Sequence, residues 1–249
     1  LMETRYSPDP VRFERMNTRE TRENFLIGNL FPPDEIALVY SHTDRAIVGS
    51  AVPVHQTLKL ESKDQLRAEY FCQRREIGVL NIGGDGLVTI DGEAFPMARH
   101  DALYIGRGSR DIVFGSADPA KPAQFYFISY PAHAQYPTTH AKVAAAEPVN
   151  LGSDRECNRR TIYKYIHPAG IKSCKLVMGF TVLAEGSVWN TMTAHTHERR
   201  SEIYLYFGLA ADSAVFHLMG RPDETRHIVV RDRQAVLSPS WSIHAGAGT

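Results

Sequence analysis

Cysteine is scarce in this chain and forms neither a metal-binding nor a disulfide pattern. Only three of the 249 residues are cysteines, Cys72, Cys157 and Cys174, and no two of them make a Cys-x-x-Cys pair. This spacing excludes a zinc ribbon and a disulfide framework, so we expect three reduced thiols that pack mostly as small apolar groups. The same cysteine usage favours a cytoplasmic protein over a secreted one.

Long apolar runs and an excess of charge of one sign are also missing. No stretch of about 18 apolar residues is present to span a membrane, and the N-terminus has no apolar signal-peptide region. Lysine plus arginine equals aspartate plus glutamate, at 28 each, so no net charge attracts a nucleic acid or an anionic membrane. We therefore expect a soluble intracellular protein whose partners include neither nucleic acid nor membrane.

Short strand-like segments fill most of the chain. They are rich in Val, Ile, Tyr and Phe, and Gly, Asp and Pro residues separate them. Many short strands at this spacing predict an all-β barrel or jelly roll rather than alternating α/β units. The predicted strands are 35–40, 45–54, 68–71, 78–82, 87–91, 101–105, 111–116, 124–130, 161–165, 173–183, 202–207, 214–219, 227–230 and 234–237.

The chain divides into an arm and two β domains of similar texture. Residues 1–30 form an N-terminal arm with one helix, because Asn17 and Glu20 have capping-box spacing for a helix that runs to about Phe25. A proline- and alanine-rich stretch at 131–148 then interrupts the strand pattern. We predict a first β domain over 31–148 and a second over 149–249. Because His244 lies so near the end, we expect a further C-terminal segment to be absent.

A metal-binding pattern stands in the second β domain. His195 and His197 are two residues apart, so both imidazoles project from the same face of a strand. Glu202 begins the next apolar run after a short polar turn. Neighbouring antiparallel strands lie about 5 Å apart, so we expect Glu202 on the strand beside that of the histidines, where its carboxylate can meet both rings. His244 follows a strand that ends at Pro239 and is the fourth candidate ligand. Three imidazoles and one carboxylate suit zinc, iron, manganese, nickel or copper, so ligand type leaves the metal open.

The spacing His195-x-His197-x4-Glu202-x5-Gly208, followed by Pro239-x4-His244, resembles the two cupin motifs. The resemblance implies a bicupin, that is, two jelly-roll (double-stranded β-helix) barrels after an N-terminal helical arm. The barrel over 31–148 has no His-x-His-x4-Glu and would be metal-free, and the barrel over 149–249 would bind the metal. Gly186, Trp241 and Gly248 depart from the usual motif positions, which indicates a divergent subfamily.

A finer resemblance is to the 5-keto-4-deoxyuronate isomerase family (4-deoxy-L-threo-5-hexosulose-uronate ketol-isomerase). It implies conversion of 5-dehydro-4-deoxy-D-glucuronate to 3-deoxy-D-glycero-2,5-hexodiulosonate in pectin degradation. It also implies a homo-oligomer, a hexamer, with one Zn²⁺ per subunit on His195, His197, Glu202 and His244. The family continues beyond the point where this chain stops. The stretches that carry the resemblance are 40–45, 74–83, 99–106, 158–162, 189–192, 195–200, 224–228 and 239–244.

The isomerisation needs a base and a partner for the substrate carboxylate. Glu198, inside the metal motif, is the nearest candidate base that is not a ligand, and a surface turn residue is an equal reading of it. A guanidinium is the natural partner of a carboxylate, although a solvated arginine or an ion pair between subunits is the more frequent role. The candidate substrate-binding residues are Arg159, Arg160, Arg199, Arg200, Arg226, Lys164 and Trp241, with Tyr163 as a further residue of the pocket wall.

Two other functions fit the same residues. A cupin dioxygenase would use these ligands to hold iron or nickel, and a non-catalytic uronate-binding cupin would bind the sugar acid without converting it. A DNA-binding regulator is disfavoured, because no helix-turn-helix segment or basic stretch accompanies the β domains. The identity of the substrate rests on the family resemblance alone.

Overall fold

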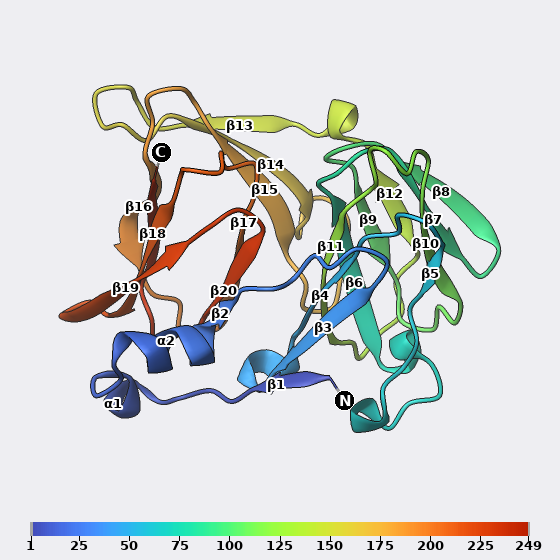
Figure 1. Cartoon of the computed structure of the whole chain (residues 1–249), viewed down its shortest axis with the longest axis horizontal. Coiled ribbons are helices and arrows are strands. Elements are labelled where there is room, and N and C mark those ends of the chain that lie inside the picture. The colour runs from blue at the N-terminus through green and yellow to red at the C-terminus, as the bar shows by residue number, and fades with distance from the viewer. Residues whose placement is uncertain (1, 249) are drawn as a thin grey trace.

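The computed structural model describes residues 2–248 and consists of two groups of β-sheets with a few short helices (Figure 1). The first group, called here the first β-unit, contains two sheets. The seven-stranded sheet has the order β1 (Glu3–Arg5), β3 (Ile36–Ser41), β4 (Ile47–Ala51), β11 (Phe125–Pro131), β6 (Arg75–Asn81), β9 (Ala102–Ile105) and β12 (Thr139–Ala141). The four-stranded sheet has the order β5 (Leu58–Lys59), β10 (Ile112–Ser116), β7 (Gly86–Ile90) and β8 (Glu93–Met97).

The second β-unit contains three sheets and carries the candidate metal ligands. One has the order β13 (Pro148–Leu151), β14 (Arg160–Ile166) and β15 (Met178–Leu183). The next has the order β16 (Trp189–His195), β21 (His244–Gly248), β18 (Val215–Arg221) and β19 (Glu224–Val230). The last has the order β17 (Glu202–Tyr206), β20 (Gln234–Ser238) and β2 (Leu26–Ile27), so a strand from the N-terminal segment completes it.

The two units share a core across the seven-stranded sheet. Along β11, Phe125 and Phe127 enter the core of the first unit. Tyr126 and Ile128 alternate with them and enter a second cluster, together with residues of β15 such as Phe180. Side chains alternate between the two faces of a strand. Because both faces of β11 are covered, its sequence is an almost continuous apolar run. The second unit is therefore packed against the first.

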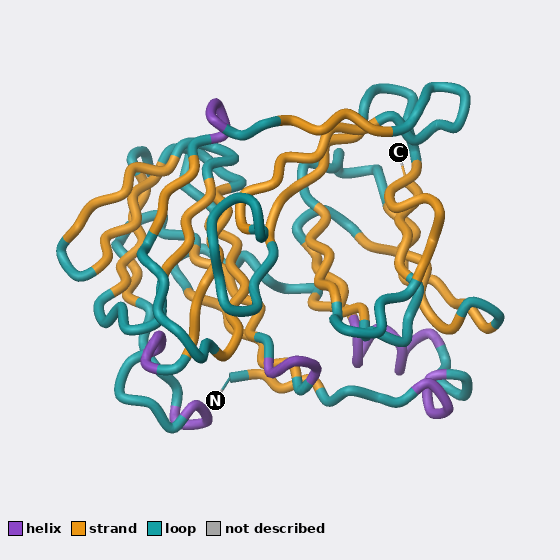
Figure 2. Tube along the Cα trace, turned by 180° about the vertical axis from the view of Figure 1, so that it is seen from behind, coloured by secondary structure: helices purple, strands orange, loops and turns teal. Residues whose placement is uncertain are grey.

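The N-terminal helices lie against the second unit (Figure 2). Helix α2 (Thr18–Phe25) is capped by Asn17, as the capping-box spacing predicts. The Asn17 side chain accepts from the Glu20 backbone N–H, and the Glu20 side chain accepts from the Asn17 backbone N–H. A shorter helix, α1 (Pro10–Phe13), precedes it. Phe13 and Phe25 pack with Met219 and Ile228, so this segment closes one side of the second unit. The 3-10 helices are η1 (Thr43–Arg45), η2 (Asp64–Leu66), η3 (Phe71–Gln73) and η4 (Val143–Ala145).

The mostly-β prediction is confirmed, and four local predictions are wrong. The N-terminal arm has two helices, α1 and α2, where one was predicted. The predicted strand 173–183 begins only at Met178. The segment 68–71 is not a strand, because its aromatic residues serve other contacts: Tyr70 lies under the guanidinium of Arg110, and Phe71 is buried at the start of η3. The proposed connection 131–148 contains strand β12, which pairs with β9. No helix within residues 2–248 has the length and apolarity needed to cross a bilayer. The division into barrels at 31–148 and 149–249 stays a prediction.

Gly49 provides a test of the packing in the first unit. It lies opposite Phe127 in the pairing of β4 with β11, and a Cβ there would overlap the Phe127 ring and come within 3.0 Å of the Ala37 carbonyl oxygen. We expect Gly49→Ala to lower the free energy of unfolding by about 1–3 kcal/mol, because a fully buried ring has no room to move. Gly115→Ala is the matched control, because its Cβ would meet nothing closer than 3.5 Å. Equal urea-unfolding midpoints for the two variants would contradict this account.

Candidate metal centre

The candidate ligands lie where the chain crosses twice between two sheets of the second unit. Strands β16 and β17 belong to different sheets, and so do β20 and β21. The sequence-based expectation that Glu202 lies on a strand beside that of the histidines is therefore wrong, since it reaches them from another sheet. The two crossing segments touch, because His197 N donates to the Ser240 carbonyl oxygen over 3.3 Å. Pro239 ends β20 and so helps to start the second crossing.

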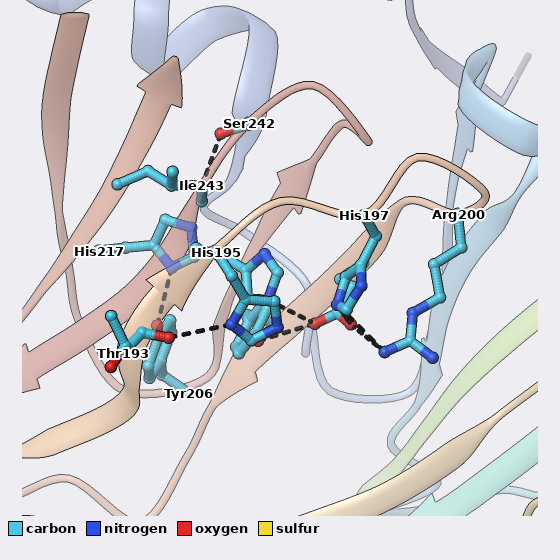
Figure 3. Close-up of polar contacts among 11 residues, drawn as sticks. Thr193, His195, His197, Arg200, Tyr206, His217, Ser242 and Ile243 are labelled. Carbon is cyan, nitrogen blue, oxygen red and sulfur yellow. Dashed lines mark hydrogen bonds and ion pairs between the residues drawn. The ribbon is translucent and has the colours of Figure 1, made fainter. Parts of the chain in front are cut away.

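Three imidazoles gather at these crossings (Figure 3). His195 ends β16 and is the direct pairing partner of His244, which begins β21. His197 lies two residues further on, past the end of β16, so the prediction that both imidazoles project from one face of a strand is wrong. The ring centroids are 4.7 Å apart for His195 and His197, and 4.6 Å apart for His195 and His244. One ligand nitrogen from each of the three rings lies within 4.8 Å of the others.

The Glu202 carboxylate joins two of these rings. Its Oε1 is 3.0 Å from His197 Nε2, and its Oε2 is 3.5 Å from His244 Nε2. Arg200 Nη2 donates to Oε1 over 2.8 Å, and the Tyr204 hydroxyl donates to Oε2 over 2.8 Å. Both carboxylate oxygens are thus held, one by a cation and one by a phenol, and this fixes the carboxylate beside the imidazoles.

The surroundings favour the protonation states that a metal requires. Burial lowers the pKa of His244, and burial together with the nearby charge of Arg200 lowers the pKa of His197. For Glu202, burial alone raises the pKa, but the Tyr204 hydrogen bond and the charges of His244 and Arg200 outweigh it and leave the pKa below its ordinary value. Neutral imidazoles and an ionised carboxylate are the forms that bind a metal ion.

A buried histidine that contacts a tyrosine lies beside the cluster. His217, on β18, is fully buried, and its Nδ1 is 2.8 Å from the Tyr206 hydroxyl. The Tyr204 ring lies between this pair and the cluster, 5.3 Å from the His217 ring and 5.6 Å from that of His244. Among the described residues, His217 Nε2 has no hydrogen-bond partner. Burial, helped by the charge of His244, lowers the pKa of His217 to about 3, so this ring is neutral at physiological pH.

The predicted residues of the turn 198–201 lie at the cluster or next to it. Arg200 contacts Glu202, and its Nη2 is also 3.2 Å from His197 Nε2. Arg199 is exposed and lines a cleft beside the cluster. Glu198 is exposed in the same turn. Its part as a base, and that of the arginines in binding, stay predictions.

The other predicted binding residues make contacts elsewhere. Arg226 donates to the backbone carbonyls of Glu14 and Met16, and Trp241 packs on Phe13, so both contact the N-terminal helical segment rather than the histidines. The remaining four lie at or near β14: Arg159 pairs with Asp154, Arg160 is buried and donates to the Asn158 carbonyl, Lys164 is exposed, and Tyr163 stacks on Phe180.

Three residues that contribute to the centre or its surroundings were not predicted. Tyr204 and Tyr206 follow Glu202 at intervals of two along β17, so they share its face, and this periodicity was an available signal. Asp44, from the first unit, accepts from the backbone N–H and the hydroxyl of Ser201 over 3.1 and 2.6 Å. It lies in the stretch 40–45 that carries part of the family resemblance, but no motif predicts this contact across the two units.

The residues at this centre fit a transition-metal ion. Three imidazole nitrogens close enough to share one ion, with a carboxylate beside them, form a donor set that suits zinc and several other divalent metals. Outer contacts from Arg200 and Tyr204 orient the carboxylate, as outer contacts do in metal sites generally.

Known proteins similar to this chain agree on one family. Residues 29–249 match the KduI/IolB family. The 4-deoxy-L-threo-5-hexosulose-uronate ketol-isomerase of Lachnoclostridium phytofermentans is 55% identical, and the proteins of that name from Caldicellulosiruptor bescii and Dickeya dadantii are 54% and 50% identical. In each case the match covers 100% of this chain and 90% of the relative.

Solved structures with low sequence identity have the same cupin-like fold. An IolB-like protein from Salmonella typhimurium superimposes with a TM-score of 0.69 at 12% identity, over 90% of this chain and 87% of that one. A variant of oxalate decarboxylase from Bacillus subtilis superimposes with a TM-score of 0.57 at 12% identity, over 90% of this chain and 73% of that one. At such identities the likeness concerns the fold.

His217 predicts a pH dependence of stability. In the unfolded chain its pKa returns to about 6.5, so below that pH the unfolded state binds a proton that the folded state rejects. The stabilising contribution is complete above pH of about 6.5 and is lost as the pH falls toward about 3, by up to about 1.4 kcal/mol per pH unit. Urea unfolding of metal-stripped protein between pH 7.5 and 5 measures this slope.

We expect His217→Gln to reduce the slope and His227→Gln, which changes an exposed histidine on β19, to leave it unchanged. A slope that is the same in His217→Gln and in the parent would show that His217 is protonated in the folded state.

Proposed function

Because the chain belongs to the KduI/IolB family, we propose that it is a 4-deoxy-L-threo-5-hexosulose-uronate ketol-isomerase, an intramolecular oxidoreductase that interconverts an aldose and a ketose sugar acid. The substrate is 5-dehydro-4-deoxy-D-glucuronate and the product 3-deoxy-D-glycero-2,5-hexodiulosonate. The observation that carries the proposal is a cluster of three histidines and a glutamate in a chain that matches relatives of this name along its whole length.

The metal in this proposal is one zinc ion per chain, held by His195, His197, Glu202 and His244. Its support is the donor set and the protonation states described above. When bound, such an ion polarises a carbonyl group and stabilises negative charge that develops on its oxygen. The fold that carries it would be a bicupin, with a metal-free first barrel.

The chain's own residues would bind and orient the substrate and would move the proton. The reaction transfers a proton between C1 and C2, so one base must reach both carbons from one side. Glu198 is the candidate for this base, since it is exposed and free of the Glu202 network. Arg200 keeps Glu202 ionised and in place, and Arg199, next to it, is available to pair with the substrate carboxylate.

The setting of the enzyme follows from the same premise. We propose a cytoplasmic enzyme of pectin and uronate degradation, consistent with three free cysteines in the described residues. We also propose a homohexamer. Its support is the resemblance to the isomerase family, which implies this assembly.

A turnover assay on the unsaturated uronate monomer, the precursor of the keto-deoxyuronate, tests the proposed function. We expect the parent to form isomerised product without consuming oxygen. His197→Ala and metal-stripped protein should lose at least about 100-fold in rate, because several kcal/mol of charge stabilisation are lost with the metal. Zinc should restore the stripped parent but not His197→Ala.

His227→Ala is the matched control, because it removes an exposed strand histidine outside the cluster and should keep both activity and metal content. Oxygen consumption by the metal-loaded parent would indicate a dioxygenase instead. Binding of the sugar acid without any conversion would indicate a non-catalytic uronate-binding protein.

A further inference from the structure

A cleft of about 690 Å³ lies between the two β-units, beside the histidine cluster. The first unit lines it with β11, Asp44 of η1 and Tyr136, and the second unit lines it with the connection between β14 and β15 and with the turn before β17. Glu202 and Arg200 belong both to this cleft and to the cluster, since Glu202 contacts His197 and His244. None of the three histidines lines the cleft itself, so Glu202 and Arg200 form the link between the cleft and the cluster.

A buried carboxylate of the first unit holds one wall. Glu76, on β6, is fully buried, and its oxygens accept from three successive backbone N–H groups: Cys174 over 2.8 Å, Lys175 over 2.7 Å and Leu176 over 3.1 Å. The Tyr104 hydroxyl donates to it as well, over 2.8 Å. A buried carboxylate without such donors would be strongly unfavourable, so the connection between β14 and β15 is held at this position.

A second carboxylate of the first unit holds the opposite wall. Asp44, in η1, accepts both the N–H and the hydroxyl of Ser201, in the turn that carries Arg199 and Arg200. The first unit thus positions two segments of the second unit on either side of one cleft.

The two walls present positive charge. Lys172 and Lys175 stand on the first wall and Arg199 on the second, and within residues 2–248 none of the three forms an ion pair. The cleft also has two carboxylates: Glu202 pairs with Arg200, and Asp44 accepts from Ser201 but keeps its charge, so the three unpaired cations exceed the one unpaired carboxylate. The cleft therefore offers cations that lack an anion, next to the reacting centre.

We propose that this cleft is the subsite for the carboxylate of the sugar acid, with Lys172, Lys175 and Arg199 as its cationic contacts and Glu76 as the residue that positions the lysines. The inference rests on the proposed function for the identity of the ligand. It gives the first β-unit a direct part in recognition. Lys172 and Lys175 were not among the substrate-binding residues predicted from the sequence.

Binding and turnover together test the subsite. Calorimetric titration of metal-loaded protein with D-galacturonate, a stable uronate, should give binding that neutral D-galactose does not. The double variant Lys172→Gln, Lys175→Gln should weaken galacturonate binding by roughly tenfold or more, because two charge-assisted contacts are lost. In turnover, KM for the sugar acid should rise by a similar factor while kcat and metal content change little. Lys121→Gln, an exposed lysine between β10 and β11, is the matched control.

Glu76→Gln tests the positioning role, because the amide keeps the shape but places an NH₂ group against backbone donors. We expect a raised KM with nearly unchanged kcat, and partial recovery in Glu76→Asp. A lower melting temperature with an unchanged KM would show that Glu76 has only a structural role.

Turnover with an unchanged KM in the lysine variant would overturn the subsite and leave the isomerase standing. Galacturonate binding that depends on the lysines, without any turnover, would overturn the isomerase and leave the subsite standing.

Discussion

The contact of the Glu202 carboxylate with His197 and His244 is the interaction on which the centre depends. It joins two sheets of the second unit at the point where the chain crosses between them twice. Arg200 and Tyr204 hold the two oxygens, so the carboxylate stays ionised despite its burial. Without it, the three imidazoles would have no anion beside them to balance the charge of a divalent ion.

The first β-unit contributes more than a core. Its seven-stranded sheet is covered on one face by its own cluster and on the other by residues of β14, β15 and β20. Two of its carboxylates, Glu76 and Asp44, extend this packing with polar contacts to the segments that flank the centre. Apolar packing brings the units together without strong directionality, whereas the carboxylates specify where each wall stands. This explains how a unit without the metal motif can bear on the chemistry of its neighbour.

Much of this arrangement was accessible from the sequence, and the remainder depends on contacts distant in the chain. Many strand positions follow from local patterns of apolar and turn residues. Strands β16 and β21, which carry His195 and His244, were not among the predicted strands, and the two residues meet by pairing between segments distant in the chain. The wrongly predicted strand at 68–71 shows the limit of local patterns. A short aromatic segment has the same sequence pattern whether it forms a strand or packs its rings outside one. Which sheet Glu202 joins depends on the pairing of β17 with β20, which is distant in the chain, and what Glu76 binds depends on packing between the units. No local pattern encodes either contact.

Anomalous scattering from a crystal of the zinc-loaded protein, recorded on both sides of the zinc absorption edge, tests the central claim most directly. The account predicts one strong peak per chain within about 2.0–2.2 Å of a nitrogen from His195, His197 and His244 and an oxygen from Glu202. A peak elsewhere, or none at this centre in zinc-loaded crystals, would contradict it.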